Sequence, residues 1–162
     1  MYAVDEKDSV HELRLPQSSV GSPSPAVLAT EQGLLLAYWL EEHAWPKDRE
    51  FSHEACALVR FSGARVHLFG PPNDEAFDGH PLAARGLRPY RAFEVRQSSW
   101  IRCIERMNAG HPRHDPARYS RLRHFVFTFH DSTFECVALD FELAIEDGDP
   151  VSILRNSISP SP

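Results

Sequence analysis

Arginine is the residue type in this sequence with the clearest capacity for recognition chemistry, and it is concentrated in one segment. Residues 85–124 contain ten arginines and three carboxylates, a net charge of +7 in a chain whose formal net charge is −6. Guanidinium groups form paired hydrogen bonds with phosphate and carboxylate groups. The segment therefore predicts an anion-binding surface over residues 85–123, bordered by the loop 71–89. We expect the contacts to come from Arg85, Arg88, Arg113, Arg118 and Arg121, with Trp45 as a partly exposed aromatic contact.

The expected partner is an acidic protein surface or a small anionic ligand. Nucleic acid is disfavoured, because the whole chain is acidic and contains no RRM core, Gly-rich clamp or zinc-finger spacing. Another interpretation is intramolecular, with the arginines paired to Glu135, Asp140, Glu142 or the N-terminal acids. Surface pairs of that kind contribute only about 0–1 kcal/mol each, so they would neutralise charge more than they stabilise the fold.

Histidine and aspartate offer a second kind of chemistry. His111, His114 and Asp115 supply nitrogen and oxygen ligands of the kind that zinc accepts, and His130 would complete such a site if the fold brought it close. This set defines an alternative function, a small metal-dependent hydrolase-like enzyme. The spacing matches no established metal motif, and Arg113 between the two histidines repels a cation. We therefore favour neither a metal site nor a cofactor.

His130 and Asp131 are also the candidate catalytic pair, with Ser132 and Thr133 beside them. A histidine, a carboxylate and a hydroxyl are the components of acid–base or nucleophilic catalysis. Chain neighbours rarely converge, because adjacent strand residues point to opposite faces of the sheet. The same residues are typical of a hairpin turn, which is the interpretation that we favour.

The acidic segments support a third class of function. Residues Glu41–Glu50 and Asp131–Asp149 flank the arginine segment in the sequence and carry 11 of the 23 carboxylates of the chain. In an immunity-type inhibitor of a basic toxin, these segments would form the interface and the arginines would not.

The composition of the chain excludes several classes of protein. The chain of 162 residues has the apolar content of a globular domain, and no apolar run approaches the ~20 residues that span a bilayer. The N-terminus lacks the apolar core of a signal peptide. Three widely spaced cysteines fit neither a disulfide framework nor a C-x-x-C site. We therefore expect a cytoplasmic protein, and the preference for arginine over lysine indicates a GC-rich bacterial genome.

Several segments alternate apolar and polar residues and predict strands. Residues 10–15 form a short strand, residues 26–30 and 34–41 form a hairpin, and residues 55–61 and 65–69 form another. Residues 90–96 and 124–130 form two more strands, and 133–143 is the longest.

One clear helix is expected at 98–109. Ser98 or Ser99 caps its start, and Trp100, Cys103, Ile104 and Met107 form one apolar stripe. Asp115-Pro116 predicts a short second helix packed on the first.

These elements predict an α+β fold with a mostly antiparallel, twisted sheet of about seven to eight strands. Residues 1–145 form a single domain. The polar, Ser- and Pro-containing residues 146–162 are expected to be a disordered tail.

Overall fold

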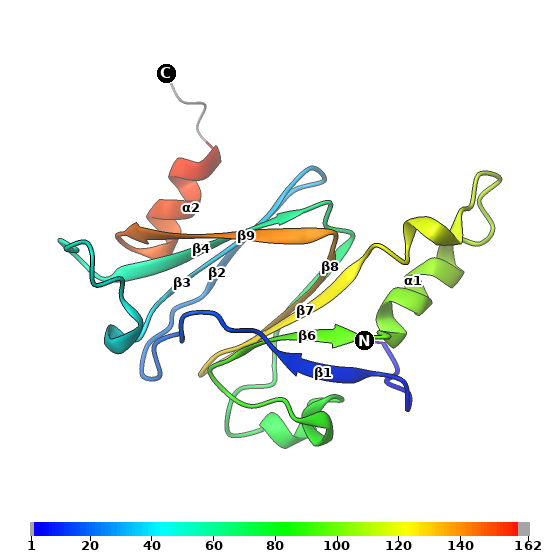
Figure 1. Ribbon diagram of the computed structural model, residues 1–162, viewed down its shortest axis with the longest axis horizontal. Helices are drawn as coiled ribbons and strands as arrows, with labels where there is room; N and C mark the ends of the chain where they lie inside the picture. The colour runs from blue at the N-terminus through cyan, green and yellow to red at the C-terminus, as the bar shows by residue number, and fades with distance from the viewer. Residues whose placement is uncertain (1, 159–162) are drawn as a thin grey trace.

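Two antiparallel sheets stack face to face in the computed structural model, and each is covered on its outer face by a helix (Figure 1). The structure describes residues 2–158. Nine strands and two α-helices lie in this part of the chain, so the α+β prediction is confirmed with slightly more strands than expected. No helix in the described part of the chain is both long and apolar enough to cross a membrane.

The five-stranded sheet has the order β1-β6-β7-β8-β5, and every pairing is antiparallel. Its strands are β1 (Ser9–Glu12), β6 (Ala92–Arg96), β7 (Arg123–Thr128), β8 (Thr133–Ala138) and β5 (Val66–Gly70). The four-stranded sheet has the order β2-β3-β4-β9. Its strands are β2 (Ala26–Ala29), β3 (Leu34–Trp39), β4 (Ala55–Ser62) and β9 (Asp140–Asp147).

Aromatic rings fill the space between the two sheets. Phe125, Phe127 and Phe134 of the five-stranded sheet contact Phe61 of β4, with ring centroids 5.5–6.0 Å apart. All four side chains are buried. The alternation of phenylalanine along β7 therefore places one face of the strand in this core, while the intervening residues face the other way.

A second core covers the outer face of the five-stranded sheet. Phe93, Val126 and Val137 on that face pack under Trp100 of helix α1 (Ser99–Asn108) and Leu82 of the loop between β5 and β6. This loop contains two 3₁₀ turns, Phe77–Gly79 and Ala83–Arg85. Because apolar residues cover both faces, β7 and β8 lie in the middle of the molecule.

The C-terminal segment differs from the predicted disorder. Helix α2 (Pro150–Ile158) follows β9, and its Ile153 and Leu154 pack on the outer face of the four-stranded sheet. Asp149 caps its start by accepting a hydrogen bond from the Ser152 amide (3.0 Å). A short, serine-containing helix has little intrinsic stability, so its composition resembles a tail and only packing on the sheet fixes it. Residues 159–162, the rest of the predicted tail, lie outside the described residues.

Two strand predictions were wrong in the same way. Segments 55–61 and 65–69 were expected to pair as a hairpin, but β4 pairs with β3 and β9, and β5 pairs with β8. The predicted long strand 133–143 is divided between β8 and β9, which belong to different sheets. The chain therefore crosses from one sheet to the other at both places. Burial of β4 on both faces decides the pairing, and a local turn pattern does not contain that information.

The two crossings touch each other. The Leu139 amide donates to the Ser62 carbonyl (2.9 Å), and the Arg65 amide donates to the Val137 carbonyl (2.8 Å). Gly63 lies between them with φ +59°, and a Cβ there would come within 2.7 Å of the Leu139 side chain. Glycine is therefore required for both its backbone angle and its small size.

Helix α1 begins one residue after its predicted cap. The Ser98 hydroxyl accepts a hydrogen bond from the Ile101 amide (3.3 Å). The predicted apolar stripe is only partly correct, because Met107 is 79% exposed. The far end of α1 and the turn after it extend beyond the sheet (Figure 1), so no residue among 2–158 covers Met107 at that end of the stripe. The predicted second helix is a single 3₁₀ turn, Pro116–Arg118, capped by Asp115.

Candidate functional site

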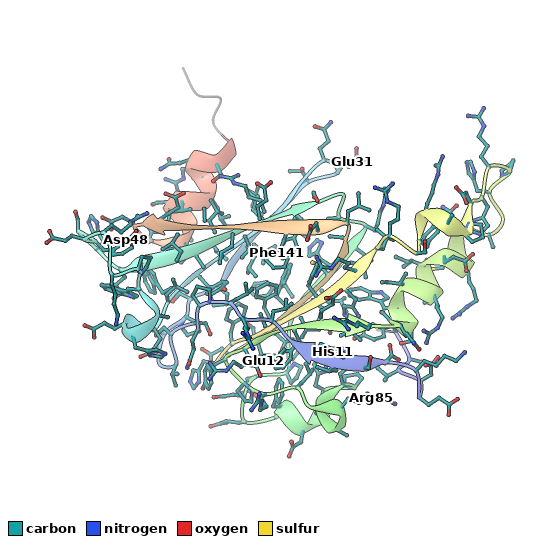
Figure 2. All side chains as sticks on the ribbon, viewed as in Figure 1. His11, Glu12, Glu31, Asp48, Arg85 and Phe141 are labelled. Atoms are coloured by element: carbon teal, nitrogen blue, oxygen red, sulfur yellow. The ribbon has the colours of Figure 1, made fainter. Side chains whose placement is uncertain are left out.

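Most arginines of segment 85–123 with a defined environment belong to one of two groups. In the first group the guanidinium is held by the protein itself. Arg85 donates to the carbonyls of Glu6 and Asp8, and Arg88 pairs with Glu12. Figure 2 labels Arg85 and Glu12 on the side of the molecule where β1 lies. These two predicted binding residues therefore have intramolecular partners.

Arg102 and Arg123 belong to the same first group. Arg102 pairs with Asp5 (2.5 Å). Arg123 pairs with Glu94 (3.0 Å) and with Asp140 (2.6 Å). The intramolecular interpretation is thus correct for part of the segment, with Asp140 and the N-terminal acids as partners.

The second group surrounds a surface cleft, which we call the arginine cleft. Its volume is about 580 Å³. The polar part of its lining comes from three segments and consists of Arg65, Asn108, His111, Arg113, Asp115 and Arg118. The apolar part consists of Ile104, Tyr119 and Leu122. Two of the predicted binding residues, Arg113 and Arg118, therefore share one cleft.

Local structure holds the loop of the cleft in place. The Asp115 carboxylate accepts a hydrogen bond from the Ala117 amide (3.0 Å), which starts the 3₁₀ turn. The His111 ring nitrogen Nδ1 accepts from the Arg113 amide (3.0 Å). These contacts order a loop that is otherwise mostly exposed.

The cleft carries a net positive charge. Arg65, Arg113 and Arg118 contribute three guanidiniums, and Asp115 contributes one carboxylate. Arg118 lies 3.7 Å from Asp115 on an exposed surface, a weak pairing. Arg65 and Arg113 form no ion pair with any residue in the described part of the chain. Two guanidiniums from distant segments therefore face one cleft with their donors available.

Sequence reasoning missed Arg65 as a member of this site. It lies in the connection between β4 and β5, twenty residues before the arginine segment begins. Only the crossing of the chain between the two sheets brings it beside α1 and the loop after it. No local signal marks it.

The remaining predicted binding residues lie elsewhere. Arg121 is exposed, but it does not line the cleft. Trp45 is partly exposed, as expected, but its ring packs 5.5 Å from that of Phe51 and its Nε1 donates to the Leu40 carbonyl (3.2 Å). The structure therefore gives Trp45 an intramolecular role.

His130 pairs with an unexpected carboxylate. Its Nδ1 lies 2.9 Å from Asp74 and 3.1 Å from the Tyr90 hydroxyl, whereas Asp131 is 4.0 Å away from Nε2. The Tyr90 hydroxyl also donates to Asp74, which lowers the pKa of that carboxyl and raises the pKa of Tyr90 to about 12. These contacts join the β5–β6 loop to the β7–β8 turn, where the backbone amide of Asp74 also donates to the His130 carbonyl (2.9 Å).

The candidate metal ligands do not converge. His114 pairs with Glu105 of α1 (2.6 Å), and His111 lines the arginine cleft. His130 lies beyond the other end of β7, whose six residues span roughly 17 Å at the usual strand rise. Among residues 2–158, no three or more His, Cys, Asp or Glu side chains are grouped so that they could hold a metal ion.

A buried polar cluster occupies the outer face of the five-stranded sheet. Glu135 of β8 accepts hydrogen bonds from the Tyr2 hydroxyl (2.6 Å), from His80 Nε2 (3.1 Å) and from His124 Nε2 (3.0 Å). The Leu82 amide donates to His80 Nδ1 (3.1 Å), which leaves Nε2 to carry the proton given to Glu135. Each of the three hydrogen bonds to the Glu135 carboxylate therefore has a side-chain donor.

These hydrogen bonds keep Glu135 ionised. Burial alone would raise its pKa, but the donors outweigh that effect and hold the pKa at about 2. His124 has no exposed surface, and Tyr2, His80 and Glu135 are each less than 10% exposed. A solvent-borne ligand does not reach this cluster. Its role is to fasten the N-terminal segment and the β5–β6 loop to the sheet.

The cysteines offer no reactive thiolate in the core. Cys56 and Cys136 are fully buried, and burial raises the pKa of both thiols, to about 12 for Cys56. A thiol with a raised pKa is a poor nucleophile.

In the arginine cleft, two guanidiniums without an ion-pair partner among the described residues line a solvent-accessible volume. The chain was compared with protein-family models, with curated proteins and with solved structures, and none of the three comparisons found a match.

Proposed function

We propose that this protein is a non-catalytic binding module that holds a small anionic ligand in the arginine cleft. The observation that carries the proposal is the convergence of Arg65 and Arg113, from different segments, on one cleft without an ion-pair partner among the described residues. Each guanidinium offers several N–H donors in a planar fork that matches the oxygens of phosphate or carboxylate.

The size and mixed lining of the cleft support an organic ligand. Its volume of about 580 Å³ lies within the usual range of ~300–1,000 Å³ for small-molecule sites. Ile104, Tyr119 and Leu122 supply apolar surface beside the charged groups. Such a combination favours a ligand with an anionic group on an apolar body.

Ion pairs and hydrogen bonds within the protein make the proposed binding surface smaller than the predicted one over residues 85–123. Arg85 and Arg88 already have protein partners, so a ligand would have to displace those contacts. Arg113 and Arg118 of the original prediction remain, and Arg65 joins them. An acidic protein surface is then the alternative ligand for the same groups.

The opposite end of the molecule supports a second candidate, the immunity-type inhibitor. The predicted acidic segment Glu41–Glu50 meets the end of the other predicted segment, Asp131–Asp149, there. Arg49 donates to the Ile145 carbonyl, and the amides of Ser52 and His53 donate to Asp147. Asp48, labelled in Figure 2, lies on the other side of the molecule from α1. In this function a basic protein would bind at that acidic end. For either function we propose a bacterial cytoplasm, where free cysteines such as these persist.

Titration calorimetry with inorganic phosphate at low ionic strength tests the first proposal. We expect millimolar binding at one site. Arg65→Gln and Arg113→Gln should each weaken binding about tenfold, the equivalent of one charge-assisted hydrogen bond. Arg121→Gln is the matched control, since it removes the same charge from a neighbouring exposed position outside the cleft.

Three outcomes separate the alternatives. Equal losses in Arg121→Gln and Arg113→Gln would mean that net charge, and not the cleft, attracts the anion. Absence of phosphate binding together with Arg113-dependent binding of a polyglutamate peptide would favour the acidic protein partner. Absence of both would contradict the proposed function.

A further inference from the structure

We propose that the ligand of the arginine cleft is an aryl phosphate monoester, an inference that rests on the proposed function. The first argument is charge. Arg65, Arg113 and Arg118 against Asp115 leave the cleft with a formal charge of +2. A phosphate monoester carries about −1.5 to −2 at neutral pH and three acceptor oxygens, so it matches this charge better than a carboxylate does.

The geometry of the arginines indicates where the phosphate binds. Arg65 extends from the β4–β5 crossing, and Arg113 extends from the loop after α1. Both are exposed and form no ion pair among the described residues, so neither has to be released from a carboxylate before it binds. Arg118 is restrained only by a 3.7 Å contact with Asp115, which a closer phosphate oxygen would replace. The phosphate is therefore expected between Arg65 and Arg113, with Arg118 as a third donor.

The apolar lining indicates an aromatic body. Tyr119 is partly buried in the lining, and its ring lies 5.9 Å from that of His114 with an interplanar angle of 39°. His114 is itself held by Glu105 of α1 (2.6 Å). The Tyr119 ring thus has a fixed neighbour in His114, and Ile104 and Leu122 of the second core line the same cleft. Offset stacking on a preorganised ring costs little conformational entropy.

The volume is consistent with such a ligand. A phosphate group alone would fill only part of about 580 Å³ and would leave the apolar part of the lining uncovered. A phosphate on an aromatic ring would cover the charged and the apolar parts of the lining together. A free small molecule and a phosphotyrosine side chain share this chemistry, and the test below distinguishes them.

The experiment compares inorganic phosphate, phenyl phosphate, benzoate and a phosphotyrosyl tripeptide, each titrated into the chain of 162 residues. We expect phenyl phosphate to bind about tenfold more tightly than inorganic phosphate, the usual gain from one aromatic contact with its burial. Benzoate, which has the ring with a single negative charge, should bind at least tenfold more weakly than phenyl phosphate. A tripeptide that binds more tightly than phenyl phosphate would identify the source as a peptide.

Tyr119→Leu separates the ring from the charge. This variant should lose the preference for phenyl phosphate and retain the affinity for inorganic phosphate, whereas Tyr119→Phe should retain both. If Tyr119→Leu does not fold, methyl resonances of the wild-type protein provide the same information. Phenyl phosphate should shift the Ile104 and Leu122 methyl signals by its ring current, and inorganic phosphate should not.

The failures are distinguishable. If inorganic phosphate binds in an Arg113-dependent manner and phenyl phosphate binds no more tightly, the proposal of an aryl phosphate ligand is wrong. The proposed anion-binding function is then still supported. If benzoate binds as tightly as phenyl phosphate, the proposed preference for a doubly charged phosphate is wrong. If no anion binds in an Arg113-dependent manner, the inference fails together with the function on which it rests.

Discussion

At the scale of single residues, the most constrained group is the carboxylate of Glu135. It is buried and ionised, and three side-chain donors from three other segments satisfy it. Buried charges are tolerated only when they are paired or fully hydrogen-bonded. The conclusion is that Glu135 serves the fold, although histidine and glutamate together resemble a catalytic pair.

We expect Glu135→Gln to destabilise the protein by about 2 kcal/mol at pH 7, because the amide group brings N–H donors to face the existing donors. The matched control is Glu142→Gln on the exposed face of β9, which should change the free energy of unfolding by less than about 0.5 kcal/mol. Urea unfolding of both variants measures the difference.

The low pKa of Glu135 also predicts how the stability of the protein depends on pH. The folded pKa of Glu135, about 2, lies below its ordinary value of 4.5. Its contribution to stability is therefore complete above pH 4.5 and is lost as the pH falls from 4.5 towards 2. The gap between wild type and Glu135→Gln should narrow over that range. A gap of constant size from pH 7 to pH 3 would show that ionisation of Glu135 is not the cause.

At the scale of elements, the two crossings between the sheets decide the topology. They meet at Gly63, where φ is +59° and a Cβ would approach Leu139 to 2.7 Å. Gly63 therefore has both a backbone angle that favours glycine and a close packing contact with Leu139.

Gly63→Ala should destabilise the protein by about 2 kcal/mol or more, through the unfavourable backbone angle and the contact with Leu139. Thermal unfolding measures the loss. Gly21→Ala is the control, because no heavy atom lies within 4 Å of a Cβ built there. Leu139→Ala removes the contact together with its own packing in the second core. The loss that Gly63→Ala causes in the Leu139→Ala background therefore reports the backbone strain. Equal stability of the two single variants would contradict the role given to Gly63.

Helix α2 gives a second prediction at this scale. Leu154 is buried against the four-stranded sheet, so Leu154→Ala should cost about 2–5 kcal/mol. Val151 of the same helix is 57% exposed, and Val151→Ala should have little effect. Chemical denaturation compares them. Two variants with wild-type stability would mean that this segment is detached from the sheet, as a disordered tail would be.

At the scale of the whole molecule, charge is separated along the chain and in space. The predicted acidic segment Glu41–Glu50 meets the end of the segment Asp131–Asp149 through the contact of Arg49 with Ile145. Helix α1, whose Ile104 and Asn108 line the arginine cleft, lies on the other side of the molecule (Figure 1). The Debye length is about 8 Å at 0.15 M salt and about 30 Å at 0.01 M. Distant charges should therefore influence the cleft only at low salt.

A double charge reversal tests this separation. Asp48→Lys with Glu50→Lys changes the formal net charge of the chain from −6 to −2 at exposed positions. Phosphate affinity, measured by calorimetry, should change by less than about twofold at 0.15 M salt and should rise at 0.01 M salt. A large change at 0.15 M salt would mean that net charge dominates and that the cleft is not a local site.

Much of the local structure could be predicted from sequence, because it depends on near neighbours. The helix at Ser99–Asn108, its Ser98 cap and the hairpin of β2 and β3 follow from capping and alternation within a few residues. The burial of Phe125 and Phe127 follows from the period of the strand. The concentration of arginine in residues 85–123 is likewise a property of the sequence alone.

Tertiary structure decided which residues became neighbours. Sequence could not show that Arg65 joins Arg113 at one cleft, that Asp74 and not Asp131 pairs with His130, or that His80 and Tyr2 meet Glu135. Each of these contacts joins segments far apart in the chain, across a sheet crossing or a long loop. Local patterns specify faces and caps, whereas the pairing of distant segments is set by burial summed over the whole core. Because burial over the whole core decides the pairing, the strands form two sheets where one was expected. The arginine cleft lies beside the β4–β5 crossing between them.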